Sequence, residues 1–185
     1  MKVNTSRFGA VEVAGTDIMD FTDGLLGFEN LKRFFIVDPA DETLILWLQS
    51  ADAPDVAFPM LEPKLFKTDY KVRLSANELR SLRIDAANKK DTLVYCILTI
   101  PAEVSAMTAN LKAPIVINTA SGQARQVVLQ ENEYSVKFPM YKELLTMMLS
   151  AGASPVKKPV SSGEEVAACA LSLKHASSKV EVIAL

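Results

Sequence analysis

The chain has 185 residues, of which 49% are hydrophobic and 23% charged, a composition typical of one globular domain with enough apolar residues for a core. Its two cysteines, Cys96 and Cys169, lie far apart without a CxxC motif, which argues against a disulfide framework and a zinc site. No apolar run reaches the ~18 residues of a membrane span, and none follows the N-terminal basic residue as in a secretory signal. We therefore expect a cytoplasmic protein.

The net charge of −2 conceals an asymmetry along the chain. Residues 1–62 contain 11 acids and 4 bases, whereas residues 63–150 contain 12 bases and 8 acids. Such a skew is typical of a surface that meets a basic partner, but also of a solvated surface whose charges mix once the chain folds. Composition alone leaves both interpretations open.

Short runs of β-branched and aromatic residues between turn signals predict strands through the first 138 residues. In chain order these runs are 2–5, 8–13, 34–37, 44–48, 56–61, 70–74, 93–100, 114–118 and 124–130. The last two flank Ser121 and Gly122, a pair typical of a hairpin turn. Many short strands at a spacing of ~8–12 residues predict a mainly β fold, either a sandwich or a barrel.

Only two short helices are expected in this part of the chain. Ser75 and Glu78 have the spacing of a capping box, in which each side chain satisfies an exposed backbone amide, and this predicts a helix near 76–83. A second helix is predicted at 141–149, where apolar residues share one face: Leu144, Leu145 and Met148.

The predicted domain covers residues 1–149. The small residues, prolines and glycines of 150–163 are typical of a linker. Residues 164–185 form a C-terminal extension to which the sequence assigns no role. Within it, 164–174 is compatible with a helix, because acids open the segment and a base closes it, and 179–185 with a strand or an unfixed apolar end.

The stretch 46–58 (LWLQSADAPDVAF) contains the only tryptophan, Trp47, followed by Gln49 and a loop with two carboxylates, Asp52 and Asp55. Two acids three residues apart in an exposed turn are a weak signal for acid–base catalysis, which needs a perturbed environment and a companion group. We expect Trp47 to anchor its strand in the core or at its rim. Asp52 is expected to cap the turn through its side-chain oxygen.

No other part of the chain predicts catalytic residues, metal ligands or a cofactor. His175, the only histidine, lies in the extension, a poor foundation for a metal site or a catalytic triad. Cys96 lies within an apolar run and is expected to be a buried small hydrophobe. The stretch from Gly24 to Gly27 lacks the spacing of a phosphate-binding loop.

Two alternative functions remain open. Small barrels bind single-stranded nucleic acid through aromatic platforms and basic grooves, and here Phe66 and Tyr70 are interleaved with basic residues: Lys64, Lys67, Lys71, Arg73, Arg80 and Arg83. The net acidic charge and the absence of an RNP-type motif argue against this function. The other alternative is an enzyme on a small β scaffold, which predicts a concave pocket with convergent polar groups.

Four blocks of sequence resemble, in order, those of the flagellar assembly factor FliW family. They are GLLGFE at 24–29, WLQS at 47–50 with the following DxPDxAF at 52–58, ANLKAPIVIN at 109–118, and QVVL at 126–129 before Tyr134. The resemblance covers roughly residues 2–149. It implies a compact, small β-barrel-like domain without catalytic activity, which binds two partners: flagellin, and the basic, mRNA-binding translational repressor CsrA.

The resemblance also implies how the two partners are coupled. Export of flagellin would free the protein to bind CsrA away from its RNA groove and to displace it from flagellin mRNA. We expect a monomer that contacts neither nucleic acid nor a membrane directly. The residues expected at the partner-binding site are Trp47, Gln49, Asp52, Asp55, Asn110, Lys112 and Asn118. A plain strand-and-turn role for the 110–118 block, with Ile115 and Ile117 pointing the same way, remains an alternative.

The chain departs from the family pattern at four positions. Leu26 stands where the family has proline, Ala51 and Ala53 stand where Leu and Asp are common, and Lys137 stands where Arg is expected. The segment after residue 149 has no counterpart in the pattern. These departures bear on partner affinity and partner choice.

Overall fold

The computed structural model describes residues 1–39, 44–130, 133–150 and 180–184. Seven strands close into a barrel in the order β10, β11, β3, β4, β5, β6, β8 and back to β10. All neighbours are antiparallel except β11 and β3, which run parallel. The strands are β3 (Met19–Phe21), β4 (Arg33–Val37), β5 (Leu46–Ser50), β6 (Ala57–Leu61), β8 (Thr92–Thr99), β10 (Ile115–Asn118) and β11 (Gln123–Gln126).

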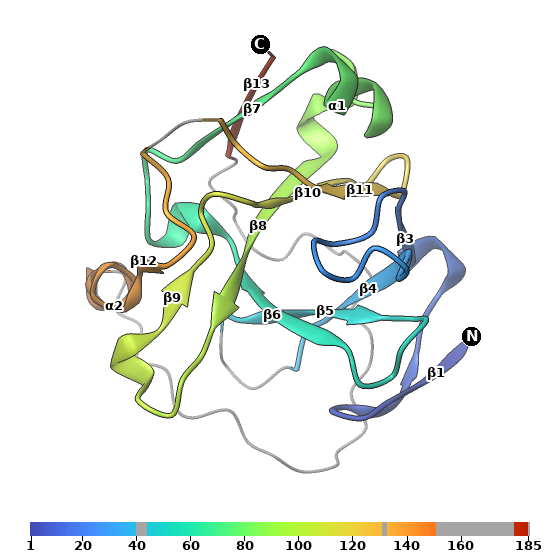
Figure 1. Ribbon diagram of the computed structural model, residues 1–185, viewed down its shortest axis with the longest axis horizontal. Coiled ribbons are helices and arrows are strands. Elements are labelled where there is room, and N and C mark those ends of the chain that lie inside the picture. Colours follow the sequence, from blue (N-terminus) through green and yellow to red (C-terminus); the bar gives the residue numbers. More distant parts are fainter. Residues whose placement is uncertain (40–43, 131–132, 151–179, 185) are drawn as a thin grey trace.

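The ring can be followed in Figure 1 from β10 and β11 at the top, through β3 and β4 on the right and β5 and β6 below, to β8. Successive side chains of a strand point to opposite faces, so each strand contributes alternate residues to the interior. The interior cluster contains Leu25, Met19, Phe21, Phe34, Ile36, Leu48, Met60, Ile115, Ile117 and Ala124, with Tyr95 of β8 packed against it. The expectation that Ile115 and Ile117 point the same way is thereby confirmed.

Two layers cover the outside of the barrel. The hairpin of β1 (Lys2–Thr5) and β2 (Gly9–Glu12) packs on the outward side chains of β4 and β5. Trp47 is only 8% exposed there; its ring meets that of Phe8 edge-on with centroids 5.8 Å apart, and the Arg7 guanidinium lies 3.9 Å from the ring centroid. The prediction that Trp47 anchors its strand in the core or at its rim is confirmed.

The second layer packs on the outward face of β8. It contains β7 (Lys71–Leu74), α1 (Ala76–Ser81), α2 (Tyr141–Ser150) and two short strands that extend the sheet from β8, β9 (Thr108–Ala109) and β12 (Phe138–Pro139). Cys96 is fully buried in this cluster, as expected, and burial raises the pKa of its thiol. Single 3₁₀ turns lie at η1 (Gly15–Asp17), η2 (Pro63–Leu65), η3 (Lys89–Asp91) and η4 (Val104–Ala106).

Both predicted helices are present. In the α1 capping box, the Ser75 amide donates to Glu78 Oε2 at 2.7 Å and the Glu78 amide donates to Ser75 Oγ at 3.4 Å. The helix ends at Ser81, two residues before the predicted end, because Arg83 adopts a left-handed backbone with φ of 53°. In α2 the predicted apolar face is confirmed for Leu144 and Met148, which are buried, whereas Leu145 is only partly buried and Tyr141 and Met147 pack against the core instead.

The extension contributes one further strand, β13 (Glu181–Ala184), which pairs in parallel with β7. Of the predicted linker only Ser150, the last residue of α2, is described. The helix expected at 164–174 and His175 lie outside the described residues. Within the described ranges, no helix has the length and apolar content needed to cross a membrane.

Candidate protein-binding surface

The loop 24–29 folds over one end of the barrel. Leu25 points into the interior cluster, whereas Leu26 and Phe28 face outward with 61% and 39% of their surface exposed. The Phe28 amide donates to the Leu25 carbonyl at 2.8 Å, which closes a tight turn. Gly24 has a φ of 74°, and a Cβ there would lie 2.8 Å from backbone atoms of Phe28 and Glu29. The GLLGFE block is therefore a turn that holds apolar side chains at the surface.

Hydrogen bonds fix this loop to strands that are distant in sequence. The Leu26 amide donates to Gln126 Oε1 at 3.0 Å, and Gln126 Nε2 donates to the Ala113 carbonyl at 3.2 Å. Within the loop, the Gly27 amide donates to a Glu29 carboxylate oxygen at 2.8 Å, and this bond is the main cause that lowers the pKa of Glu29. Three of the four family-like blocks thus meet at one place in the fold.

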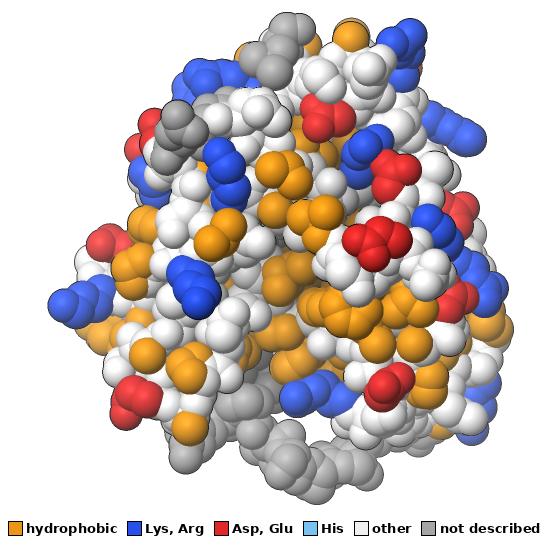
Figure 2. All heavy atoms as spheres, in the orientation of Figure 1, with side chains coloured by type: hydrophobic (Ala, Val, Ile, Leu, Met, Phe, Trp, Pro, Cys, Tyr) orange, Lys and Arg blue, Asp and Glu red, His pale blue; other side chains and the backbone are white. Residues whose placement is uncertain are grey.

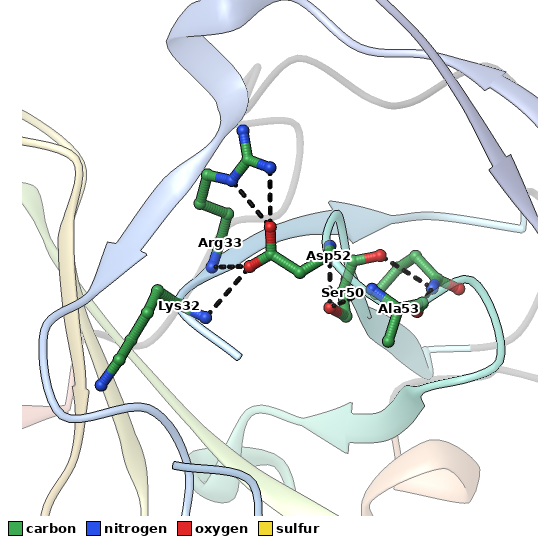
Figure 3. A network of polar contacts seen from close by, with 6 residues as sticks. Lys32, Arg33, Ser50, Asp52 and Ala53 are labelled. Carbon is green, nitrogen blue, oxygen red and sulfur yellow. Dashed lines mark hydrogen bonds and ion pairs between the residues drawn. The ribbon is translucent and has the colours of Figure 1, made fainter. Parts of the chain in front are cut away.

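Asp52 joins the next turn to the start of β4 (Figure 3). Its Oδ2 accepts hydrogen bonds from the backbone amides of Lys32 at 3.1 Å and Arg33 at 2.9 Å. Its Oδ1 accepts from Arg33 Nε at 2.8 Å and lies 2.7 Å from Arg33 Nη2. Burial acts to raise the pKa of Asp52, but the bonds from the Arg33 backbone and side chain outweigh it and leave the pKa lowered.

The expectation that Asp52 caps its own turn is wrong. The Ser50 hydroxyl does so, accepting from the amides of Asp52 and Ala53, both at 3.0 Å (Figure 3). Ser50 is the last residue of β5, so its short side chain reaches the amides two and three residues ahead. The longer reach of the Asp52 carboxylate extends across to β4 instead.

Gln49 supports the same turn from inside. Its side chain is fully buried, and Nε2 donates to the carbonyls of Ser50 and Val56, both at 3.0 Å. The Ser50 amide also donates to the Val56 carbonyl at 2.9 Å, and the Ser6 amide of the N-terminal hairpin donates to the Pro54 carbonyl at 2.8 Å. These bonds satisfy the backbone groups of a loop that would otherwise leave them unpaired.

The seven residues expected at the partner-binding site are separated by the fold. Trp47, Gln49 and Asn118 are buried, so they act on a partner only through the loops that they hold in place. Asn118 Nδ2, for example, donates to the carbonyls of Leu82 and Arg83, both at 2.9 Å, at the end of α1.

Four of the seven remain accessible to a partner. Asp55 is exposed, and the side chain of Asp52 is 23% exposed beside Arg33. Asn110 Oδ1 accepts from the Ala113 amide at 3.0 Å, and Lys112 is partly buried in the same turn. The turn geometry at Asn110 agrees with the strand-and-turn alternative for this block.

Three apolar residues at this end of the barrel were missed by the sequence-based site: Leu26, Phe28 and Phe58. The rings of Phe28 and Phe58 meet edge-on with centroids 5.1 Å apart, which links the loop to the start of β6. We define the barrel-mouth surface as Leu26, Phe28, Glu29, Asp52, Asp55 and Phe58. Figure 2 shows hydrophobic side chains gathered on this side of the molecule with acidic side chains beside them. In the sequence, Leu26, Phe28 and Phe58 were marked only by their position inside the family-like blocks.

The aromatic residues of the nucleic-acid alternative are not at the surface. Phe66 is 5% exposed and Tyr70 is fully buried. The Tyr70 hydroxyl donates to the Leu111 carbonyl at 2.7 Å, and its ring lies 4.7 Å from that of Tyr134. Side chains in these positions pack the core and offer no stacking platform for bases.

Comparison with known proteins agrees with the four blocks. A family model described as "FliW protein" matches residues 2–140. The chain belongs to the FliW family. It is 41% identical to the flagellar assembly factor FliW of Bdellovibrio bacteriovorus over 167 residues, which cover 90% of this chain and 94% of that protein. It is 38% identical to that of Thermoanaerobacter pseudethanolicus over 145 residues, 78% of this chain and 95% of that protein.

The fold is also that of the FliW family. A crystal structure of the flagellar assembly factor FliW matches with a TM-score of 0.70 and 34% identity, covering 76% of this chain and 96% of that one. Leu26 stands at the position where the resemblance leads us to expect proline. Because Leu26 is 61% exposed, it presents a larger and more flexible apolar side chain at the barrel-mouth surface than proline would.

Proposed function

We propose that this chain is a non-enzymatic regulator of flagellar assembly that binds flagellin in the cytoplasm, as a monomer. Freed of flagellin, it binds a CsrA-like translational repressor and relieves repression of flagellin synthesis. Membership in the FliW family supports the assignment to flagellar assembly. The observation that carries the binding function is the barrel-mouth surface, where apolar side chains are exposed on a tightly held loop.

The barrel-mouth surface suits a protein partner for two reasons. Exposed aromatic and large apolar side chains that cluster within an acidic border are typical of binding anchors. Leu26 and Phe28 project from a turn held by the Gln126 bond and by two glycines with left-handed backbone, Gly24 and Gly27. Because the loop is already ordered, little conformational entropy is lost on binding. Flagellin is the partner that we assign to these apolar anchors.

The acidic residues at the same end of the barrel suit the second, basic partner. Glu29 is exposed directly after Phe28 in the loop, and Asp55 is exposed in the turn that leads from β5 into β6. Complementary charge mainly accelerates encounter and excludes wrong partners. If flagellin and the repressor share this surface, binding of one lowers the apparent affinity for the other, which couples flagellin export to flagellin synthesis.

The proposal is tested by titrating the purified chain with monomeric flagellin and with the repressor, by calorimetry, separately and in competition. Leu26→Asp is the test variant and Leu149→Asp the matched control, because these leucines are 61% and 62% exposed and lie on different elements. We expect Leu26→Asp to weaken flagellin binding at least tenfold, Leu149→Asp to leave it unchanged, and flagellin to weaken repressor binding. Absence of flagellin binding by the wild-type chain would refute the proposed function.

A further inference from the structure

The strand β13 occupies an edge that the barrel itself does not fill. It pairs in parallel with β7 over four positions, with Glu181 beside Lys71 and Val182 beside Val72. Among the described residues, β7 has no other strand partner. An unpaired strand edge exposes a row of backbone donors and acceptors, which any extended segment can use.

Side chains make this edge selective. Val182 is 3% exposed and joins the cluster that contains Val72 and Leu74, so the edge has an apolar site for one small side chain. Next to it, Lys71 Nζ lies 3.0 Å from a Glu181 carboxylate oxygen. The hydrogen bond from Lys71, and the charges of Lys71, Lys64 and Lys89, lower the pKa of Glu181. The edge thus accepts an acidic residue followed directly by a small apolar one.

Some relatives have little chain with which to fill this edge, although the Bdellovibrio protein is matched over 167 residues. The Thermoanaerobacter protein is matched over 95% of its length by 145 residues of this chain, and the crystal structure is covered to 96% by 76% of this chain. A family model that ends at residue 140 includes β7 but not β13. The edge therefore belongs to the shared body of the fold, whereas the strand that covers it here belongs to the extension.

We propose that the edge of β7 is a docking site for an extended segment of a partner protein, and that β13 occupies this site in cis. The segment that fits has an acidic residue followed by Val or Ile and adds a parallel strand, as in other cases of recognition by β-strand addition. This site is separate from the barrel-mouth surface, so it goes beyond the proposed function and does not depend on the identity of flagellin or the repressor as partners.

The cis strand should mask the site. A tethered segment competes at a high effective concentration. The apparent affinity for an external segment is therefore the intrinsic affinity multiplied by the small fraction of molecules in which the site is free. The probe is a fluorescent peptide with the sequence of residues 179–185, added to the full-length chain and followed by anisotropy. Val182→Asp in the full-length chain places a charge in the apolar site and releases β13.

We expect the peptide to half-saturate the Val182→Asp chain at a concentration at least tenfold lower than the wild-type chain. A peptide that itself carries Val182→Asp should bind neither. Equal binding of the peptide to wild type and variant, or binding to neither, would overturn the proposal. A wild-type dimer that Val182→Asp dissociates, measured by light scattering, would also overturn it, because the occupant would then be a second copy of the chain.

Far-UV circular dichroism shows whether the Val182→Asp chain folds. If it does not fold, a charge-reversal pair at Lys71 and Glu181 provides a second test. The side chains of Lys71 and Glu181 are 47% and 56% exposed, so substitutions there leave the core intact. Full-length Glu181→Lys should bind the wild-type peptide more tightly than the wild-type chain does. Adding Lys71→Glu to that variant restores the cis pair and should abolish the gain. An unchanged affinity across these variants contradicts the proposal.

Discussion

At the residue scale, Asp52 is an acid in a loop that was expected at the partner-binding site, but its side chain stabilises the fold. Both of its carboxylate oxygens accept hydrogen bonds from Lys32 and Arg33, which ties the turn after β5 to the first residue of β4. Bonds to an ionised group are stronger than neutral ones. Asp52 therefore holds two segments of the barrel-mouth surface together, and Asp55, which has no such bonds among the described contacts, is the acid of this pair that is better placed to meet a partner.

Replacing Asp52 by Asn should destabilise the protein by about 1–3 kcal/mol at pH 7. The folded-state pKa of Asp52 is lowered from 3.8. The charged carboxylate therefore stabilises the folded state above that value, and this stabilisation is lost as the pH falls through the folded-state pKa. The stability difference between wild type and Asp52→Asn should therefore narrow below about pH 4. Urea unfolding of both proteins from pH 7 to pH 3 measures it, and a difference that is constant with pH contradicts the assigned role.

Replacing Trp47 by Ala should cost about 3–5 kcal/mol, since the side chain is almost entirely buried between β5 and the N-terminal hairpin. Trp47→Phe, which keeps a ring against Phe8, is the matched control and should cost less. Thermal melts beside a flagellin-binding assay separate the two possible roles of Trp47. A Trp47→Ala protein that melts like the wild type but loses its partner would show that Trp47 acts in binding.

At the scale of elements, the loop 24–29 depends on its first glycine more than on its second. Gly24→Ala places a Cβ 2.8 Å from the backbone of Phe28 and Glu29 in addition to the left-handed strain, whereas a Cβ at Gly27 meets nothing within 4 Å. Gly27→Ala should cost about 1–2 kcal/mol from backbone strain alone, and Gly24→Ala clearly more. Urea unfolding compares them, and equal costs would contradict this account of the loop.

Local patterns were enough to predict most elements, because an apolar strand between turn residues leaves a signal within a few residues. They missed β3, whose three residues with one exposed Asp20 carry almost no pattern. Sandwich and barrel could not be separated, because closure depends on the β8–β10 and β11–β3 pairings between distant segments. The barrel was predicted from the family resemblance, because the periodicity of the sequence does not distinguish a barrel from a sandwich.

The site was harder to predict than the fold. Gln49 and Asn118 are polar and follow apolar runs, yet both are buried, and their side-chain amides donate to backbone carbonyls. Conversely, Leu26 and Phe28 have the composition of core residues but are exposed by a turn whose direction is set by Gly24 and by the distant Gln126. Burial is decided by contacts across the chain, which a residue pattern does not contain.

At the scale of the whole molecule, the acidic excess of residues 1–62 is partly neutralised by folding. Asp23 pairs with Arg125 of the second segment at 2.9 Å, whereas the pair of Asp52 with Arg33 joins two residues of the first segment. Asp55 and Glu29 remain exposed at the barrel mouth. Some acids of this segment therefore mix with basic residues once the chain folds, whereas others remain exposed, and a basic partner for the exposed acids stays a prediction.

The remaining acids predict a salt-dependent association with the basic repressor. Exposed charges are screened beyond about 8 Å at physiological ionic strength, so the on-rate should fall as salt rises. Asp55→Lys should lower the on-rate more than it raises the off-rate, with Asp85→Lys, at an exposed acid in the loop between α1 and η3, as control. Stopped-flow kinetics measure both rates. An on-rate that is the same at low and high salt contradicts electrostatic steering.

We propose that flagellin binds at the barrel mouth, and hydrogen–deuterium exchange of the chain with and without flagellin tests this proposal. Flagellin should protect backbone amides in 24–33 and 50–58, while α2 exchanges as in the free chain. Protection confined to α2 or to β7, with the two barrel-mouth segments unchanged, would contradict it.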